Sequence, residues 1–478
     1  MHEPMHEPMH EGPARILVLG GGGREHAISW KLASEAGIVE VLVAPGSAGI
    51  AAEPGVRVLA VDPLDPGAVV ALARAWAVGL VIVGPEAPLS VGVADALGAA
   101  GIAVFGPTKD AARLETSKTF CHDVARAAGV RMARARSFAG GETDAALAFV
   151  KELGKAGAGV VLKADGLAAG KGVIVTESTA QALALAPSFL VDRPADGPAL
   201  VVEERLTGRE ASVIAICDGE RAVALPAARD HKRLGDGDAG PNTGGMGAYS
   251  PLPDVDDAGL KAILETVHRP ILAEMARRGT RFRGFLYVGL MLTVDGPAML
   301  EINARLGDPE AQVILPRVAT DLGPLLLAAA QGRLPESLPP LVPAKPGAAV
   351  GIVLAASGYP NDPRRGDPIS GMDAARDAGA LVFHAGTAAG PDPIGTGFVT
   401  NGGRVLTVVG RGEDLASARA AAEHAADEIT WDGLQRRHDI AADLPLPAAR
   451  PLIAADLPLP AARPLPAAPH PAALEAVR

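Results

Sequence analysis

The sequence predicts an α/β fold with a parallel sheet near the amino terminus, and three observations support this. Short apolar runs rich in Val and Ile alternate with segments of helical spacing along residues 13–440. Hydrophobic residues make up 48% of the 478-residue chain, enough for buried cores in roughly three domains. Many of the 57 glycines follow apolar runs. Loops at the carboxyl ends of parallel strands are where such sheets bind ligands.

The first domain is expected over residues 13–113. Residues 26–36 have helical spacing. The apolar runs that we interpret as strands lie at 15–20, 40–43, 80–83 and 102–105. Buried strands that alternate with helices are typical of βαβ units, so these strands are expected to form one parallel sheet.

Two further domains are expected. Residues 114–333 contain strands that are interrupted by long Gly-rich loops, and residues 334–347 form a Pro-rich linker. A small α+β domain follows over residues 348–440. Its predicted strands are 349–355, 381–385 and 404–409, and its predicted helix is 416–429.

Both ends of the chain are repetitive. Residues 1–12 read MHEPMHEPMHEG, and AADLPLPAARPL occurs at 441–452 and again at 454–465. On a helix the three histidines of the first repeat would be spaced for a metal, but Pro4 and Pro8 oppose that helix. We expect a disordered arm over 1–12 and a disordered Pro/Ala-rich tail over 441–478.

Composition excludes several classes of protein. The net charge of −11 argues against non-specific nucleic-acid binding. Two cysteines are too few for a disulfide framework or a Cys-rich zinc site. No apolar run approaches the roughly 18–20 residues of a membrane helix, and the amino terminus lacks a secretory signal. We expect a monomeric cytoplasmic protein that acts on small molecules, with no nucleic acid or membrane as a partner.

The first glycine cluster, LGGGGREHA at 19–27, joins a strand to a helix. The backbone N–H groups and positive end of such a turn suit a phosphate, and Arg24 adds forked donors. The alternative is a plain tight turn. APGSAG at 44–49 and GPEAPL at 84–89 follow the next strands and are expected at the same edge of the sheet.

A second cluster, VVLKADGLAAGKGVIV at 160–175, is not a P-loop. Gly166 and Gly170 are separated by three residues, and the β-branched residues after Gly172 continue as a strand rather than a helix. Lys163 and Lys171 flank this flexible loop and would offset the charge of a polyphosphate. The alternative is a solvated hairpin with surface lysines.

Three more segments carry chemistry. In VVEERLTGRE at 201–210, Glu203 and Glu210 flank a turn and would accept bonds from an amino group and from hydroxyls. Residues 229–251, RDHKRLGDGDAGPNTGGMGAYSP, are predicted to be a long functional loop. In EINARLGD, Glu301 and Asn303 share one face of a strand and suit Mg²⁺, although an edge strand with a polar face would look the same.

These motifs, in this order, resemble those of the phosphoribosylamine–glycine ligases, or glycinamide ribonucleotide synthetases, of the ATP-grasp superfamily. The resemblance spans residues 15–440, and DHKR…GPNTGGMG is its most specific part. It implies a pre-ATP-grasp domain, an ATP-grasp module with a small lid at about 124–202, and a small C-terminal α/β domain. The implied reaction joins glycine to 5-phosphoribosylamine with ATP through glycyl phosphate, in purine biosynthesis.

The resemblance also implies roles for residues. The nucleotide would be held by Lys118, Lys163, Lys171, Glu203, Glu204, Leu206 and Glu210. Mg²⁺ or Mn²⁺ would be held by Glu301 and Asn303. The reaction centre would be lined by Arg305, Asp230, His231 and Lys232. The other substrates would be held by Gly22, Gly23, Arg24, Glu25, Pro85, Glu86, Arg233, Pro241, Asn242, Thr243, Gly244, Gly245 and Asp308.

Two alternatives compete with this interpretation. Another ATP-grasp ligase or carboxylase would keep the lysines and the Glu301/Asn303 pair but lack the DHKR…GPNTGGMG segment. A non-enzymatic nucleotide-binding regulator would show damaged lysine or metal positions, and these are intact in the sequence.

Overall fold

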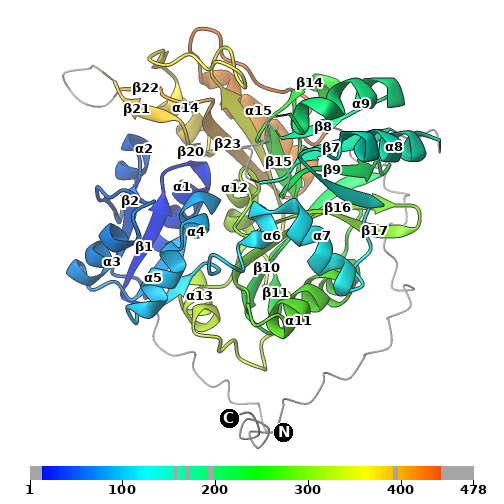
Figure 1. The fold of residues 1–478 in the computed structure, drawn as a ribbon. Helices are drawn as coiled ribbons and strands as arrows, with labels where there is room; N and C mark the ends of the chain where they lie inside the picture. Colours follow the sequence, from blue (N-terminus) through cyan, green and yellow to red (C-terminus); the bar gives the residue numbers. More distant parts are fainter. Residues whose placement is uncertain (1–12, 156–158, 167–171, 192–196, 391–396, 443–478) are drawn as a thin grey trace, which may run out of the picture.

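A computed structural model describes residues 13–155, 159–166, 172–191, 197–390 and 397–442 (Figure 1). The predicted arm at 1–12, Lys171, and residues 443–478 of the predicted tail lie outside the described residues. No helix in the described part of the chain is long and apolar enough to span a bilayer.

The N-terminal lobe is built on a five-stranded sheet in the order β3-β2-β1-β4-β5, and every pairing in it is parallel. Its strands are β1 (Arg15–Gly20), β2 (Glu40–Pro45), β3 (Val56–Val58), β4 (Leu80–Val83) and β5 (Val104–Phe105). Its helices are α1 (Gly23–Ala33), α2 (Ala48–Ala51), α3 (Pro66–Ala75), α4 (Glu86–Ser90) and α5 (Val93–Ala99). The predicted parallel sheet is confirmed.

Burial explains these strands. All four residues of β4 are buried, as are five of six in β1, so both faces are covered and the runs are continuously apolar. Helix α1 begins three residues before the predicted position 26. At the start of the helix the Gly22 N–H has no acceptor within the helix backbone. It donates instead to the Glu25 carboxylate at 2.8 Å, and this bond caps the earlier turn.

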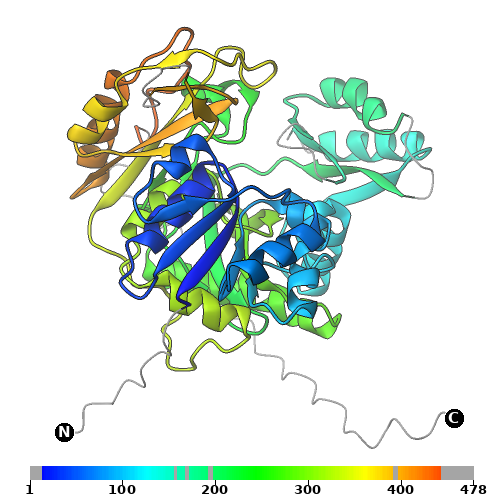
Figure 2. The ribbon, with the colours of Figure 1, turned by 90° about the vertical axis from the view of Figure 1, so that its left-hand side faces the viewer.

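A small lobe is connected through α6 (Arg113–Thr116) and α7 (Lys118–Ala127). Its sheet has the order β6-β9-β7-β8 and stands apart from the body in Figure 2. Its elements are β6 (Ala135–Ala139), α8 (Thr143–Gly154), β7 (Val160–Ala164), β8 (Val173–Val175), α9 (Thr179–Leu185) and β9 (Pro198–Glu204). Strands β7 and β8 pair antiparallel, so the strand–loop–strand interpretation of 160–175 is correct at both flanks.

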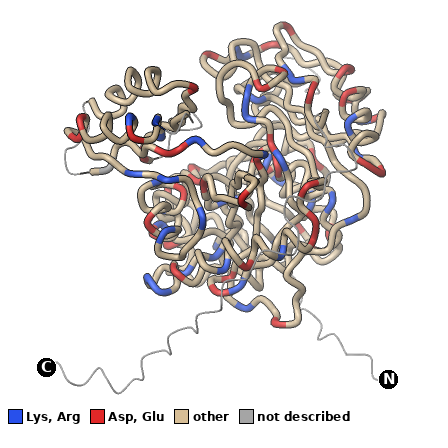
Figure 3. The backbone as a smooth tube through the Cα atoms, turned by 90° about the vertical axis from the view of Figure 1, so that its right-hand side faces the viewer, with Lys and Arg blue, Asp and Glu red and all other residues tan. Residues whose placement is uncertain are grey.

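The central sheet has the order β11-β10-β16-β17, with antiparallel pairings. Its strands are β10 (Arg209–Asp218), β11 (Ala222–Ala224), β16 (Arg283–Thr293) and β17 (Gly296–Asn303). The helices that follow β11 and β17 are α10 (Asp257–Ile263), α11 (Arg269–Arg277), α12 (Glu310–Ile314) and α13 (Leu322–Ala330). Figure 3 shows acidic and basic positions side by side where the chain leaves the small lobe for this sheet.

The C-terminal lobe shares its main sheet, β12-β15-β18-β23-β20, with an earlier part of the chain. Its own elements are β18 (Ala348–Ala355), α14 (Met372–Asp377), β20 (Leu381–His384), β23 (Arg404–Gly412) and α15 (Leu415–Glu428), with a small sheet of β19 (Pro368–Ile369), β22 (Phe398–Thr400) and β21 (Thr387–Ala389). The borrowed strands are β12 (Arg229–Asp230) and β15 (Gly247–Ser250).

Residues 229–251 were expected to be an irregular loop, and that expectation is wrong. Besides β12 and β15, the segment contains a hairpin of β13 (Arg233–Gly235) and β14 (Ala239–Asn242). Its six glycines hide the apolar alternation by which strands are found in a sequence. Pairing of β15 with β18, which lies far along the chain, supplies the order instead.

Candidate functional site

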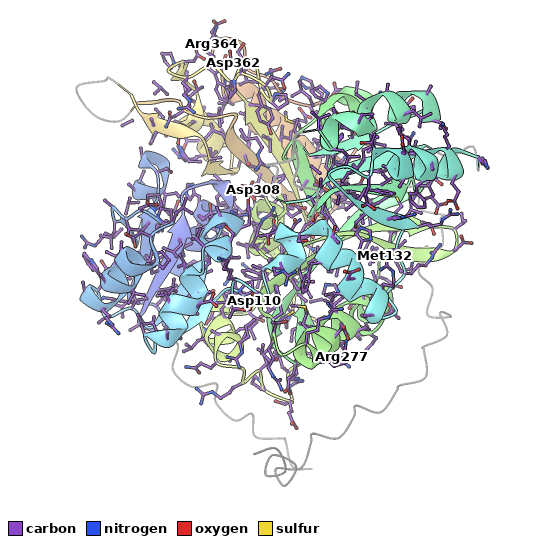
Figure 4. All side chains as sticks on the ribbon, in the orientation of Figure 1. Asp110, Met132, Arg277, Asp308, Asp362 and Arg364 are labelled. Carbon is purple, nitrogen blue, oxygen red and sulfur yellow. The ribbon has the colours of Figure 1, made fainter. Side chains whose placement is uncertain are left out.

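Two neighbouring cavities lie where the lobes meet. The first has a volume of about 570 Å³ and the second about 510 Å³. Asp230, Lys232, Asn242 and Glu301 line both, so these side chains form a shared wall. Asp308, which lines the second cavity, lies near the middle of the molecule between the N-terminal and C-terminal lobes (Figure 4). Ligands bound in the two cavities would therefore both contact these four side chains.

The first cavity lies between the small lobe and the central sheet. Strands β7, β8 and β9 contribute to one side, and the chain from β9 into β10 continues it. Of the residues predicted to hold a nucleotide, it is lined by Lys163, Glu203, Glu204, Leu206 and Glu210. Apolar side chains of Val161, Val173, Val175, Met291 and Leu300 complete a mixed surface that suits a flat ring with a charged end.

Lys163 and Glu203 form a buried ion pair at the base of this cavity. Lys163 Nζ lies 2.8 Å from Glu203 Oε2 and donates to the Leu300 carbonyl at 2.8 Å. The other carboxylate oxygen lies 2.8 Å from His122 Nε2. Burial would raise the pKa of Glu203, but Lys163 and His122 lower it below its ordinary value. Glu203 is therefore ionised and orients Lys163 towards the cavity.

The shared wall carries opposite charges at close range. Lys232 Nζ lies 3.2 Å from Glu301 Oε1 and 3.4 Å from Glu210 Oε2. The charge of Lys232 lowers the pKa of Glu301 to about 2, despite burial. Burial raises the pKa of Asp230 to about 8, and Glu310, Glu210 and Glu301 add to the rise against the opposing effect of Lys232. Proton affinity thus differs sharply between neighbouring carboxyls of this wall.

Glu301 and Asn303 lie at the end of β17 and both line the second cavity. They are the two hard oxygen donors that the sequence predicted to share a face. No group of three or more metal-ligating His, Cys, Asp or Glu side chains occurs among the described residues. This donor set fits Mg²⁺ or Mn²⁺ that keeps waters and takes phosphate oxygens, which is how such ions are usually held beside a nucleotide.

Arg305 connects the N-terminal lobe to the second cavity. Its guanidinium lies 3.3 Å from Glu86 Oε2 and 3.1 Å from Glu115 Oε1. Burial would lower the pKa of Arg305, but Glu115 and Glu86 raise it above its ordinary value. The cation is thus fixed in place rather than free to follow a ligand.

Arg24 and Glu86 reach the second cavity from the glycine-rich edge of the N-terminal sheet, together with Pro85. Arg24 is only 7% exposed and donates to Glu25 at 2.5 Å and to the Leu306 carbonyl at 3.2 Å. A Cβ on Gly21 would collide with the Gly46 carbonyl, so two loops of this edge pack backbone to backbone.

Three predicted substrate residues of this loop do not line either of the two cavities. They are Gly22, Gly23 and Glu25. Glu25 is 2% exposed, and its carboxylate accepts from Gly22 and Arg24 while packing against Gly20 and Gly84. In the structure it therefore holds the loop together and positions Arg24.

Lys118 begins α7 and lines the second cavity. Its backbone N–H donates to Asp165 at 2.5 Å and its Nζ donates to the Gly166 carbonyl at 3.0 Å. Burial lowers the pKa of Lys118, against the opposing effect of Glu301. The described flanks of the Gly loop thus bring this lysine, as well as Lys163, to the site.

The 229–251 segment contributes to both cavities. His231 and Arg233 line the first, and Thr243 and Gly244 line the second. Pro241 and Gly245, which were also predicted to hold substrate, line neither of the two. Gly245 instead packs its backbone against Pro309. Its φ is +113° and a Cβ there would lie 2.5 Å from Pro309 Cδ, so glycine is the residue that fits this position.

Sequence reasoning assigned no role to at least five residues that line the second cavity, among them Glu310. Glu115 comes from α6 and Tyr287 from β16, and Tyr359 and Arg404 come from the C-terminal lobe. Glu115 lies three residues before Lys118, for which a role was predicted, so this part of the sequence held a usable signal. Tyr359 and Arg404 stand outside every motif singled out, and only the fold brings them to the site.

Comparison with known proteins gives one consistent result. Three family models match, described as phosphoribosylglycinamide synthetase N domain (residues 14–115), ATP-grasp (A) domain (116–311) and C domain (349–443). Curated phosphoribosylamine–glycine ligases from Streptomyces coelicolor and Yersinia pestis are 49% and 45% identical. These alignments cover 90% and 89% of this chain and 99% and 97% of those proteins.

Solved structures agree. The crystal structure of phosphoribosylamine–glycine ligase from Thermotoga maritima is 33% identical, with a TM-score of 0.73, and the match covers 89% of this chain and 100% of that one. The biotin carboxylase domain of a Hydrogenobacter thermophilus carboxylase matches at 15% identity and a TM-score of 0.62 over 89% and 92% of the two chains. The second likeness concerns the fold alone.

Proposed function

The chain belongs to the phosphoribosylglycinamide synthetase family, and from this premise we propose how its two cavities carry out the ligation. The enzyme is an ATP-grasp carbon–nitrogen ligase of purine biosynthesis that joins glycine to 5-phosphoribosylamine. We assign ATP to the first cavity and 5-phosphoribosylamine to the second. The observation that supports this assignment is that Lys163, Glu203, Glu204, Leu206 and Glu210, the residues predicted to hold the nucleotide, line the first cavity and not the second. The wall of Asp230, Lys232, Asn242 and Glu301 that the cavities share would bring the two ligands together.

The reaction is proposed to pass through glycyl phosphate. A carboxylate oxygen of glycine attacks the γ-phosphorus of ATP, and ADP leaves. The amine of 5-phosphoribosylamine then attacks the acyl carbon, phosphate leaves, and the amine nitrogen loses a proton. We propose that Asp230 and His231 are the polar side chains next to the amine when it loses this proton. The chain supplies position and charge rather than a covalent nucleophile.

The nucleotide's partners follow from the lining of the first cavity. We propose that Lys163, held in place by Glu203, neutralises the phosphates together with Lys171 and with Lys118, which would reach them from the second cavity. Backbone groups of Glu204 and Leu206 would meet the adenine, and Glu210 the ribose. A bound Mg²⁺ or Mn²⁺ would neutralise phosphate charge, and Glu301 and Asn303 are its proposed ligands.

The second cavity suits a phosphorylated sugar. Arg24, Lys118, Lys232 and Arg305 supply cations, and Glu86 and Asp308 supply acceptors for hydroxyls. We propose that Arg305 also contacts the reacting atoms, and Glu86 and Glu115 hold its guanidinium in a fixed position. We propose that the enzyme works as a monomer and that it acts in the cytoplasm, where its phosphorylated substrates are retained.

Glu301→Gln tests the proposed metal site. Losing one carboxylate oxygen from a two-residue donor set should reduce kcat by at least about 100-fold at saturating Mg²⁺, while the melting temperature stays within about 4 °C. Glu336→Gln, at an exposed position of the linker, is the matched control and should keep full activity. Full activity of Glu301→Gln would refute the metal assignment.

The substrates are tested directly by ADP release. Release should require both glycine and 5-phosphoribosylamine, and it should form glycinamide ribonucleotide. Release with bicarbonate or formate in place of glycine would favour the alternative of another ATP-grasp ligase or carboxylase.

A further inference from the structure

The wall of the second cavity that faces the C-terminal lobe carries a residue that no motif predicted. Arg404 is the first residue of β23, and its side chain is 22% exposed. It lies about 100 residues beyond the Glu301–Asp308 segment in the sequence but lines the same cavity. Asp308, its main neighbour, lies between the lobes in Figure 4.

The guanidinium of Arg404 joins two loops. Its Nη1 donates to the Gly244 carbonyl at 2.6 Å and to the Asp308 carbonyl at 2.6 Å. Its Nη2 lies 3.4 Å from Asp308 Oδ2. A planar, forked cation can hold two carbonyls and a carboxylate in one arrangement, which a point charge such as an ammonium cannot do.

A second side chain of the same lobe holds the same loop. The Gly244 N–H donates to the Tyr359 hydroxyl at 3.1 Å, so Gly244 is held through both its N–H and its carbonyl. A Cβ on Gly244 would lie 3.1 Å from Arg404 Cζ, which explains why a glycine fits where the loop meets the guanidinium.

The loop is also fixed on either side of Gly244. After it, β15 pairs with β18 from Gly247↔Ile352 to Ser250↔Ala349. Before it, the hairpin at 233–242 is bound by Arg437, which donates to the Arg233 carbonyl at 3.2 Å and to Asp238 at 2.7 Å. The C-terminal lobe is thus the support on which residues 233–250 are held.

We infer that Arg404 is a positioning residue for the phosphorylated substrate, and that it acts by holding the Gly244 loop and Asp308 at a fixed separation across the second cavity. Arg404 lines the second cavity and not the first, so we expect its effect to fall more strongly on one substrate. The inference rests on the proposed assignment of 5-phosphoribosylamine to the second cavity.

The test measures binding of the stable product, glycinamide ribonucleotide, and of ADP to the full chain by calorimetry. Arg404→Ala should weaken product binding about 10-fold or more, because two charge-assisted hydrogen bonds to the loops are lost, and should leave ADP binding within about 2-fold. Arg404→Lys should recover only part of the affinity. In turnover assays the KM for 5-phosphoribosylamine should rise more than the KM for ATP.

Two further variants keep the result interpretable. Arg411→Ala removes an exposed arginine near the other end of β23, whose guanidinium makes a long hydrogen bond to the Gly379 carbonyl at 3.5 Å, and it should bind both ligands normally. Tyr359→Phe removes one hydroxyl and should weaken product binding a few-fold without affecting ADP.

Unchanged product affinity in Arg404→Ala would overturn the inference. So would an equal loss of product and ADP affinity with a lowered melting temperature, because that pattern belongs to a residue that only stabilises the fold. If the unmodified enzyme binds ADP but no glycinamide ribonucleotide, the proposed function fails instead, and the two failures are thereby distinguished.

Discussion

His384 links the C-terminal lobe to the N-terminal lobe through its backbone. Its backbone N–H donates at 2.8 Å to Nδ1 of His26, which lies in the first glycine cluster at 19–27. Its ring nitrogens lie 3.0 Å from Thr387 Oγ1 and 3.2 Å from Arg376 Nη2. Burial, then the nearby His26 and Arg376, lower the pKa of His384 to about 3. The ring is therefore neutral in the folded protein.

This burial predicts acid sensitivity with a defined sign. The unfolded chain takes up a proton on His384 near pH 6.5, and the folded chain does so only near the lowered pKa. Stability from this group is thus present above about pH 6.5 and falls by up to about 1.4 kcal/mol per pH unit below it. The melting temperature of the unmodified protein should fall more steeply between pH 6.5 and 5 than that of His384→Asn. Parallel slopes would contradict the prediction.

Residues of the site could be predicted where the type and spacing of side chains indicate a ligand. They could not be predicted where the packing of the fold determines which side chain reaches the cavity. Glu301 and Asn303 were found because alternation along a strand puts both on one face. Glu25 carries the same functional group as Glu86, but the fold buries Glu25 under its own loop and leaves Glu86 in the cavity. Arg404 was missed because its short hydrogen bonds go to the backbone carbonyls of Gly244 and Asp308, which have no signature in the sequence.

At the scale of elements, α15 packs on β23 without room for a side chain at Gly410. A Cβ there would collide with the backbone of Ala418 and Ala422. Gly410→Ala should therefore force the helix off the strand and destabilise the C-terminal lobe by about 1–3 kcal/mol, the range for overpacking. Chemical denaturation followed by circular dichroism would measure the loss.

Gly98→Ala is the matched control for this prediction. Gly98 lies in α5, and a Cβ there would have open space around it, with no contact within 4 Å among the described residues. Alanine should therefore stabilise the helix by about 0.5–1 kcal/mol. Equal effects of the two substitutions on the free energy of unfolding would mean that close packing of α15 on β23 does not determine the stability of the C-terminal lobe.

Elements differed in how well the sequence predicted them. Strand β4 occupies the predicted residues 80–83, because a buried parallel strand is apolar throughout and needs no distant partner to be recognised. The strands of 229–251 were missed, because β12 and β15 exist through pairing that ends on β18. Local pattern predicts elements that bury their own faces and misses those that a distant strand completes.

At the scale of the whole molecule, the site exists only where separate lobes meet. Arg24 and Glu86 come from the N-terminal lobe, Lys163 from the small lobe and Arg404 from the C-terminal lobe. The first cavity is lined mainly by the small lobe and the central sheet, whereas the second also takes residues from the N-terminal and C-terminal lobes, and both ligands would contact the shared wall. This arrangement predicts distinct footprints for the two ligands.

Hydrogen exchange on the full chain can measure those footprints. ADP should slow exchange in residues 160–164 and 201–210, and glycinamide ribonucleotide should slow it in residues 20–25 and 305–310, because ligand contact suppresses local opening. Both should protect residues 229–245, which contribute to both cavities. Protection of 201–210 by glycinamide ribonucleotide alone would reverse the assignment of the cavities. If no segment is protected by both ligands, they do not contact a shared wall, and the proposed transfer between the cavities would be refuted.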